Sequence, residues 1–264
     1  MNYKDMLRQK TMPHIWCPGC GHGIVLAAFL RALAKMSLDP DKVAVISGIG
    51  CSSRASGYLD FNTLHTTHGR AIPFASGIKM ANPELKVIVL TGDGDSAAIG
   101  GNHLIHAARR NIDLTVIVFN NNIYGMTSGQ YSPLTPHLKL ATTAPYGNFD
   151  YPFDLVNLAK GAGATFVARG AAVQPRHLEK IIGQGLDHDG FSLIEAISQC
   201  PTYYGRRNKM GTAVDMLQWQ RENTSLSGKE GKIPLGVFVQ EERPEFGANY
   251  FQFAKRVAEG KSSE

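Results

Sequence analysis

The residues from Lys86 to Tyr124 constrain the fold of this chain more than any other stretch. A β-branched run over 86–90 stops at a glycine turn, and a stretch with helical spacing follows from 97 to 110. A second apolar run, over 114–119, comes next. Short continuous apolar runs are typical of strands that are covered on both faces, as in a parallel sheet. The stretch therefore predicts a βαβ unit whose two strands end at the same carboxyl edge.

Each of these predicted strands is followed by residues suited to a phosphate or a metal ion. Gly92-Asp93-Gly94-Asp95 follows the first strand, and Asn120-Asn121-Asn122 follows the second. Glycines let a phosphate approach the backbone, and a helix start presents free N–H groups to it. Side-chain oxygens of Asp93 and Asn121, the carbonyl of Ile123, two phosphate oxygens and a water would complete an octahedral Mg²⁺ site. The alternative is a pair of ordinary turns rich in Gly, Asp and Asn.

The rest of the chain continues the α/β alternation around a long irregular stretch. Residues 1–16 are expected to form an extended arm, and 125–152 a loop whose length is typical of functional or disordered loops. We predict a doubly wound, mainly parallel sheet in a domain over 1–205, with a C-terminal extension over 206–264 that packs on this domain or on a partner subunit. Further helices are expected at 23–36, 70–79, 153–160 and 175–186, strands at 43–49, 165–169 and 191–197, and amphipathic stretches at 214–221 and 250–257.

The bulk properties exclude several classes of protein. The formal net charge of +5 is mild and comes without long Lys/Arg runs, which gives little support for nucleic-acid binding. No apolar run approaches the ~20 residues needed to span a bilayer. The first residues lack the apolar core of a signal peptide. We therefore expect a cytoplasmic protein that binds neither nucleic acid nor membrane.

All four cysteines lie at predicted turns. Cys17 and Cys20 precede a predicted helix, whereas Cys51 and Cys200 follow predicted strands, at the edge that carries the Gly-Asp-Gly turn. Because disulfides are rare in the cytosol, four thiolates suggest a [4Fe–4S] cluster or a structural zinc. Two of the cysteines are isolated and a proline, Pro201, follows the last one, which favours the cluster. The alternative is an incidental C-x-x-C with two unrelated buried thiols.

The chain resembles the β subunit of a 2-oxoacid:ferredoxin oxidoreductase, and most of all the 2-oxoglutarate branch of that family. The resemblance covers residues 13–205, with an echo at 236–244, and rests on WCPGCG, GIGCSSR, HTTHGRAIPFASGIKMANP, GDGDSAAIGGNHL and NNNIYGMTSGQ in this order. It implies a thiamine diphosphate fold, Mg²⁺ and one [4Fe–4S] cluster. The family oxidatively decarboxylates a 2-oxoacid with coenzyme A to an acyl-CoA and CO₂ and reduces ferredoxin, or runs in reverse.

Matched by position, the resemblance implies a role for each motif residue. Asp93, Asn121 and the carbonyl of Ile123 would hold Mg²⁺, and Cys17, Cys20, Cys51 and Cys200 would hold the cluster. The cofactor would contact Ile49, Gly50, Cys51, Ser52, His68, Gly94, Asp95, Gly125 and Met126. Met126 would prop the cofactor in its bent shape. For His68 the alternative is a structural histidine that satisfies a local turn.

The substrate is expected to be 2-oxoglutarate, with succinyl-CoA as the product. Arg54 offers a planar guanidinium to the second carboxylate, and Ser128 is the second candidate contact. Alternatively, Arg54 pairs with a neighbouring acid or with the partner subunit. Pyruvate or another 2-oxoacid is the alternative substrate.

The resemblance also implies a partner, because no motif for the glutamate that activates the cofactor is found in this chain. That glutamate resembles a contribution of the family's α subunit. We therefore expect activity only with the α subunit, on a 2-oxoacid and coenzyme A, with ferredoxin as electron acceptor. Two rival functions remain: a non-redox thiamine diphosphate decarboxylase or synthase, and an iron–sulfur electron-transfer subunit without turnover.

Overall fold

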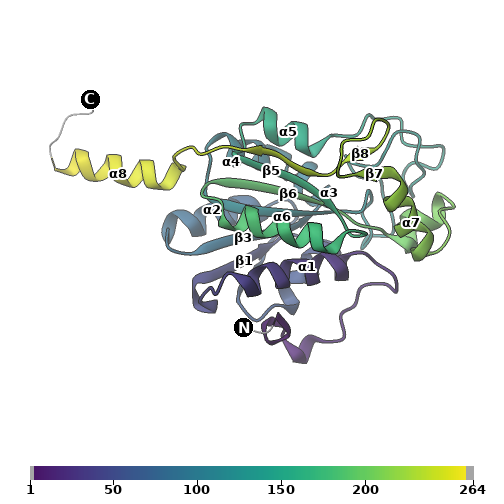
Figure 1. Ribbon diagram of the computed structural model, residues 1–264, viewed down its shortest axis with the longest axis horizontal. Helices are drawn as coiled ribbons and strands as arrows, with labels where there is room; N and C mark the ends of the chain where they lie inside the picture. Colours follow the sequence, from purple (N-terminus) through teal and green to yellow (C-terminus); the bar gives the residue numbers. More distant parts are fainter. Residues whose placement is uncertain (1–2, 260–264) are drawn as a thin grey trace.

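A seven-stranded sheet forms the centre of the computed structural model, which describes residues 3–259 (Figure 1). Its strands are β1 (Val43–Ser47), β2 (Asn62–His65), β3 (Lys86–Gly92), β4 (Leu114–Asn120), β5 (Phe166–Ala171), β6 (Phe191–Ile197) and β9 (Gly236–Gln240). They lie in the order β2-β1-β3-β4-β6-β5-β9, and only β9 runs antiparallel to its neighbour. β7 (Thr224–Ser225) and β8 (Ile233–Pro234) form a separate pair.

Helices cover both faces of the sheet, which confirms the predicted doubly wound α/β fold. One layer holds α1 (His22–Lys35) and α6 (Pro175–Asp187), in front in Figure 1. The other holds α2 (Ala71–Ala81), α4 (Gly101–Arg109) and α5 (Leu155–Gly161). Every residue of β4 and β6 is buried between the layers, as expected for strands covered on both faces. The other helices are α3 (Asp93–Ala97), α7 (Ala213–Asn223) and α8 (Phe246–Ala258).

Local sequence signals fix where several helices begin. The Asp154 carboxylate caps α5 by accepting hydrogen bonds from the N–H groups of Val156 and Asn157. Thr212 and Asp215 form a capping box at the start of α7. α6 begins at Pro175, where the missing N–H of proline costs nothing. These caps supply partners for N–H groups that a helix leaves unsatisfied.

The structure differs from the sequence-based expectations at three places. The helix expected at 97–110 starts only at Gly101, because α3 takes up Asp93–Ala97 and the chain turns at 98–100 before α4. β2 lacks an apolar run, since this edge strand is mostly exposed, and only its pairing with β1 defines it. The arm expected to be extended contains short 3-10 helices at Tyr3–Met6 and Gln9–Thr11. The other predicted helices and strands are present, with shifted ends.

The two edges of the sheet have different roles. β1, β3, β4 and β6 all end at the carboxyl edge, where the predicted site residues lie. β9 runs the other way, and its last residue, Gln240, pairs with Phe166 at the start of β5. The chain therefore leaves β9 at the amino edge, and α8 projects from the body there (Figure 1). Among residues 3–259, no helix is long and apolar enough to cross a membrane.

Candidate functional site

Twelve residues predicted to bind the cofactor or its metal line one cavity at the carboxyl edge. The three predicted Mg²⁺ ligands, Asp93, Asn121 and Ile123, are among them. The nine predicted cofactor contacts complete the set: Ile49, Gly50, Cys51, Ser52, His68, Gly94, Asp95, Gly125 and Met126. They meet because β1, β3 and β4 are adjacent and parallel, so the turns that follow them share one edge.

The carboxylate of Asp93 is buried at the start of α3, with 3% of the residue exposed. Its Oδ2 accepts a hydrogen bond of 2.5 Å from Ser132 Oγ. Burial raises the pKa of Asp93 to about 7, although hydrogen bonds from Ser132 and from the N–H of Gly94 lower it. A divalent cation would relieve this cost of burying the charged form. The residue therefore has the chemistry of a ligand to a hard cation.

The second turn carries the amide that would complete this metal site. Asn121 is 5% exposed, and its Oδ1 accepts a hydrogen bond of 3.2 Å from the N–H of Ile123. Asn120 Oδ1 accepts another from the N–H of Asn122, at 3.0 Å. Asn122 has φ of 62°, a left-handed conformation that Asn tolerates better than most residues. The turn thus holds an amide oxygen and the Ile123 carbonyl at the cavity that Asp93 lines.

Tyr124, which was not among the predicted site residues, also lines the cavity. Its hydroxyl donates a hydrogen bond of 3.0 Å to the carbonyl of Gly94, and burial raises its pKa to about 12. A Cβ added to Gly94 would lie 2.3 Å from the Tyr124 ring. Gly94 must therefore be glycine for a steric reason as well as for close approach of a phosphate.

The side chain of Asp95 ties together the loops that surround the cavity. Its Oδ1 accepts a hydrogen bond of 2.7 Å from the N–H of Gly69, and its Oδ2 one of 2.9 Å from Thr91 Oγ1. His68 Nδ1 lies 3.2 Å from Oδ1, a contact without hydrogen-bond alignment. A Cβ on Gly48 would lie 1.9 Å from Oδ2, so the β1 turn also requires glycine. The Asp95 carboxylate is thus engaged by protein groups.

His22 is a second cavity residue that the sequence patterns did not single out. It is 1% exposed at the start of α1, and burial lowers its pKa to about 4, so the ring is neutral. One ring nitrogen lies 3.2 Å from Ser198 Oγ and the other 3.4 Å from Asn121 Nδ2. The ring also packs edge-on against Phe119. His22 therefore restrains the Asn121 amide from the side of α1.

The four cysteines line a second cavity, of about 230 Å³, directly beside the first. Cys17 is exposed, Cys20 and Cys51 are half-buried, and Cys200 is buried. Cys51, Asn121, Gly125 and Met126 line both cavities. A Cβ on Gly125 would lie 3.3 Å from Cys51 Sγ and 3.8 Å from Cys200 Sγ, so glycine there leaves room for both sulfurs.

The donor set of this cavity fits an iron–sulfur cluster. Burial raises the pKa of Cys20 to about 12 and that of Cys51 to about 11, so bare thiolates would be costly there. Burial also raises the pKa of Cys200, but the N–H groups of Tyr204, Tyr203 and Thr202 lower it. Such N–H groups stabilise sulfur ligands.

Contacts between distant segments hold the cysteine loops in place. Trp16 Nε1 donates a hydrogen bond of 2.6 Å to the carbonyl of Cys51, which ties the first cysteine loop to the turn after β1. Gln199 Nε2 donates to the carbonyl of Gly19 at 3.1 Å, and the N–H of Gly21 donates to the Gln199 carbonyl at 3.0 Å. The loop that carries Cys17 and Cys20 is thus fixed to the residue before Cys200.

The two residues predicted to contact the substrate lie outside the lining of both cavities. Arg54 is half-buried in a short 3-10 helix, Ser52–Tyr58, that follows the turn after β1. Its Nε is buried without a hydrogen-bond partner. Ser128 is exposed, with φ of 86°. Both lie at the carboxyl edge, in segments that adjoin the first cavity.

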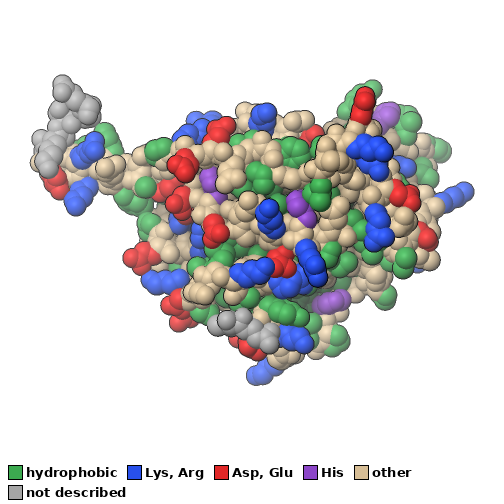
Figure 2. Space-filling model, viewed as in Figure 1, with side chains coloured by type: hydrophobic (Ala, Val, Ile, Leu, Met, Phe, Trp, Pro, Cys, Tyr) green, Lys and Arg blue, Asp and Glu red, His purple; other side chains and the backbone are tan. Residues whose placement is uncertain are grey.

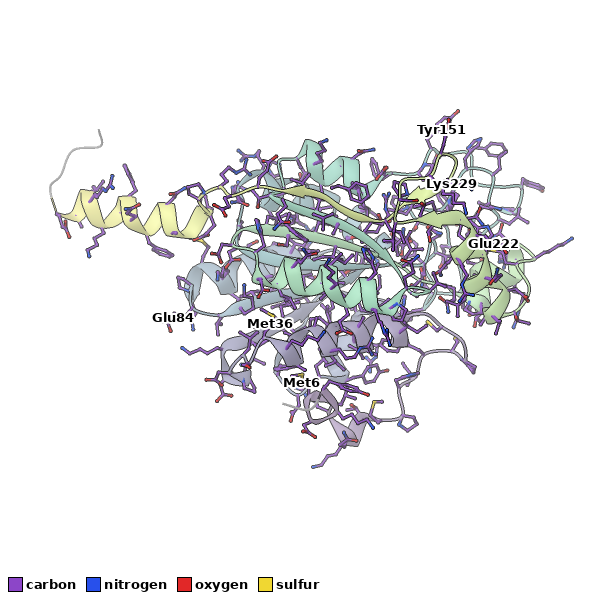
Figure 3. The ribbon with its side chains drawn as sticks, viewed as in Figure 1. Met6, Met36, Glu84, Tyr151, Glu222 and Lys229 are labelled. Atoms are coloured by element: carbon purple, nitrogen blue, oxygen red, sulfur yellow. The ribbon has the colours of Figure 1, made fainter. Side chains whose placement is uncertain are left out.

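The loop predicted over 125–152 is ordered by its own contacts and supplies Ser132, which donates a hydrogen bond to Asp93. The N–H of Thr142 donates to the carbonyl of Gly129 at 2.7 Å, and Asn148 Nδ2 donates to the carbonyl of Thr135 at 2.7 Å. The loop also exposes large aromatic residues: Tyr146 is 88% and Tyr151 86% exposed. Figure 3 shows Tyr151 pointing outward beyond the sheet. The loop thus presents large aromatic side chains to solvent.

Comparisons with known proteins agree with this geometry. The family described as thiamine pyrophosphate enzyme, C-terminal TPP binding domain, matches residues 34–196. The 2-oxoglutarate synthase subunit KorB of Methanothermobacter marburgensis is 53% identical over 252 residues, which cover 92% of this chain and 88% of that protein. The subunit of the same name from Archaeoglobus fulgidus is 49% identical over 265 residues, covering 99% and 98%.

A solved structure is also similar over nearly the whole chain. It is a 2-oxoglutarate:ferredoxin oxidoreductase from Magnetococcus marinus, with 2-oxoglutarate, coenzyme A and succinyl-CoA bound. The TM-score is 0.89 at 34% sequence identity, and the match covers 99% of this chain and 92% of that one.

Proposed function

The chain belongs to the KorB subunit family of 2-oxoglutarate synthases, and from this premise we propose its reaction, cofactors and partners. It is the subunit of an enzyme that oxidatively decarboxylates 2-oxoglutarate with coenzyme A to succinyl-CoA and CO₂ and reduces ferredoxin, or catalyses the reverse. This subunit binds thiamine diphosphate with Mg²⁺ and carries one [4Fe–4S] cluster.

A single observation carries the proposal: the cavity of the predicted cofactor residues adjoins the cavity of the four cysteines. Cys51, Asn121, Gly125 and Met126 line both. Groups bound in the two cavities would be separated only by the atoms of these residues. That proximity suits electron transfer from a cofactor to a cluster, and it has no use in a non-redox thiamine enzyme.

The residues of the first cavity are suited to anchor the cofactor by its diphosphate. Thiamine diphosphate supplies the electron sink for loss of CO₂ from a 2-oxoacid. Asp93 brings a charged oxygen, while Asn121 and the Ile123 carbonyl bring neutral ones, a hard-donor set suited to Mg²⁺. Ser132 and Tyr124 hold this set by hydrogen bonds to Asp93 and to Gly94. Exposed Met126, 44% accessible, offers an apolar support to the rest of the cofactor.

The second cavity is suited to hold the cluster and to hand on electrons. Cys20 and Cys200 are covered by the protein, whereas Cys17 is exposed on the surface. A cluster bound there would lie near the surface, where a soluble acceptor such as ferredoxin docks. The N–H groups that face Cys200 favour the more negative, reduced form of such a group.

The cavity needs a second subunit to be complete. Its acidic side chains are Asp93 and Asp95, and both are engaged, by Ser132 and by Thr91 and Gly69. Neither is free to activate the cofactor as the glutamate of the family does. We assign that glutamate to the α subunit. The exposed Tyr146 and Tyr151 of the loop over 125–152 are suited to contact it.

Anaerobic purification with the α subunit tests the proposal. The complex is assayed with a panel of 2-oxoacids, coenzyme A and a viologen dye, and its thiamine diphosphate, magnesium, iron and acid-labile sulfide are measured. We expect all four cofactor components and a rate that depends on 2-oxoglutarate and coenzyme A, with no rate from this chain alone. A complex without iron and sulfide would indicate a non-redox thiamine enzyme, and one without thiamine diphosphate an electron-transfer subunit.

A further inference from the structure

The C-terminal helix α8 forms an arm with an exposed apolar stripe. Among its residues, only Gly247 is buried. Phe246, Tyr250, Phe253 and Val257 follow one another at helical spacing on one face, and the last three are 53%, 52% and 54% exposed. Phe246 and Tyr250 stack at 6.1 Å, so the stripe begins where the helix leaves the core. A stripe of large apolar side chains in water marks a contact surface.

A large acidic groove lies on the body at the base of this arm. The groove has a volume of about 1210 Å³, and Ala248 of α8 forms part of its wall. Its lining contains six carboxylates against two basic side chains, Lys79 and Arg243. Lys79 already pairs with Asp113 at 2.6 Å. The exposed carboxylates of the groove are those of Asp187, Asp189, Glu241 and Glu242.

The far half of the arm carries the opposite charge. Lys255 and Arg256 are both exposed in the last turn of α8. Figure 2 shows blue side chains on the arm and red side chains on the body near its base. The helix has 13 residues, so its two ends are about 20 Å apart at a rise of ~1.5 Å per residue. A basic tip and an acidic base on one rigid arm cannot reach each other within the same chain.

We propose that α8 pairs antiparallel with α8 of a second copy of this chain, around a two-fold axis. The stripe has its own midpoint between residues 251 and 252. Around this midpoint, Phe246 faces Val257 of the other copy and Tyr250 faces Phe253. The same register places Lys255 opposite Ala248, which is part of the wall of the acidic groove. A single two-fold rotation therefore buries the apolar stripe of both copies. It also places the basic tip of each copy next to the acidic groove of the other.

The position of α8 on the body leaves room for a second copy of this chain. α8 leaves the body from the amino edge of the sheet, whereas both cavities lie at the carboxyl edge. Pairing through α8 therefore leaves the cofactor cavity open to the α subunit. The self-complementary charge pattern, basic tip against acidic base, is what an isologous contact requires.

Crosslinking of the assembled complex tests which molecule covers the stripe. Ala254→Cys places a thiol on the flank of the stripe, and Gln252→Cys places one about 200° around the helix from Tyr250. After treatment with a short bismaleimide, we expect a covalent dimer of this chain from Ala254→Cys and none from Gln252→Cys or from the parent protein. Crosslinking of Ala254→Cys to the α subunit, or no crosslink, would overturn the proposal.

Reversing the charges of the basic tip and of the acidic groove tests whether the two surfaces bind each other. Light scattering after gel filtration at about 0.1 M salt gives the mass of the complex. We expect Lys255→Glu with Arg256→Glu to halve the number of copies of this chain per complex, without loss of helix content or of turnover per site. Adding Glu241→Lys and Glu242→Lys should restore the parent mass. An unchanged mass in the first variant, or no recovery in the second, contradicts the assignment of the groove.

Discussion

Glu195 holds Asn120 by a hydrogen bond of 2.7 Å from Asn120 Nδ2 to Glu195 Oε1, and this contact ties the turn after β4 to the centre of the sheet. The other end of the same amide accepts the N–H of Asn122. Arg169 Nε donates to Glu195 Oε2 at 2.6 Å, and an Arg169 NH2 group donates to Asp154 at 2.6 Å. The turn that presents Asn121 and Ile123 is therefore positioned by a buried network of charged groups.

We predict that Glu195→Ala strongly destabilises the fold. It would leave the Arg169 guanidinium, with 8% of its side chain exposed, paired only with the half-exposed Asp154. Removal of one partner of a buried pair costs about 3–5 kcal/mol. Urea unfolding measures the free energy, with Glu84→Ala as the matched control because Glu84 pairs with Lys42 at the surface (Figure 3). Equal stabilities of the two variants would contradict the role of the network.

We predict that Asp93 makes Mg²⁺ binding depend on pH. Because burial raises the pKa of Asp93 to about 7, protons compete with Mg²⁺ below that pH, and the affinity falls by up to about tenfold per pH unit. The metal-free chain shows the opposite trend in stability. Its folded form binds this proton more tightly than the unfolded chain, whose pKa is 3.8, so stability falls as the pH rises from about 4 to 7.

Isothermal titration of Mg²⁺–thiamine diphosphate between pH 6 and 8 checks this prediction. Asp93→Asn is the control for protons bound by the diphosphate, because its amide does not titrate; its slope should be smaller. Asp93→Ala should remain folded and keep the cysteine cavity, but bind the cofactor much more weakly. Unchanged affinity in Asp93→Ala would exclude this residue as the metal ligand.

We predict that each of the four cysteines is needed for the cluster. Replacing Cys17, Cys20, Cys51 or Cys200 by serine should lower the iron content and remove the broad absorption of a [4Fe–4S] centre, because all four residues line the same cavity. Cys200→Ser is the most demanding case, since 149 positions separate it from Cys51. A Cys200→Ser protein with full iron and full ferredoxin reduction would refute the assignment.

We predict that Arg54 contributes to kcat/KM for 2-oxoglutarate but not to kcat/KM for pyruvate. Arg54→Met should lower kcat/KM for 2-oxoglutarate by at least about tenfold, or ~1.4 kcal/mol, because it removes a charge-assisted contact to the second carboxylate. Pyruvate lacks that carboxylate, so its kcat/KM should change little. Loss of the same size on both substrates would mean that Arg54, whose Nε is buried without a partner in this chain, supports the fold or the cofactor instead.

The sequence by itself determined the parts of the site that depend on local pattern and on sheet topology. Continuous apolar runs identify buried parallel strands, and parallel strands end at one edge. That rule is enough to bring together Asp93 and Asn121, which are 28 positions apart, and to add Cys51 and Cys200. The Gly-Asp-Gly turn and the C-x-x-C motif then indicate which chemistry this edge serves.

Only the tertiary structure decided which polar side chains contact one another at the site. The family resemblance implies that Asp95 contacts the cofactor, and the structure adds that its carboxylate accepts hydrogen bonds from Gly69 and Thr91. Ser132 reaches Asp93 across 39 positions, and His22 reaches Asn121 across 99. Such contacts leave no periodic signal, because they arise when distant loops meet at one edge. A local pattern reports which face of a strand or helix is buried, and packing in three dimensions decides which polar atoms meet there.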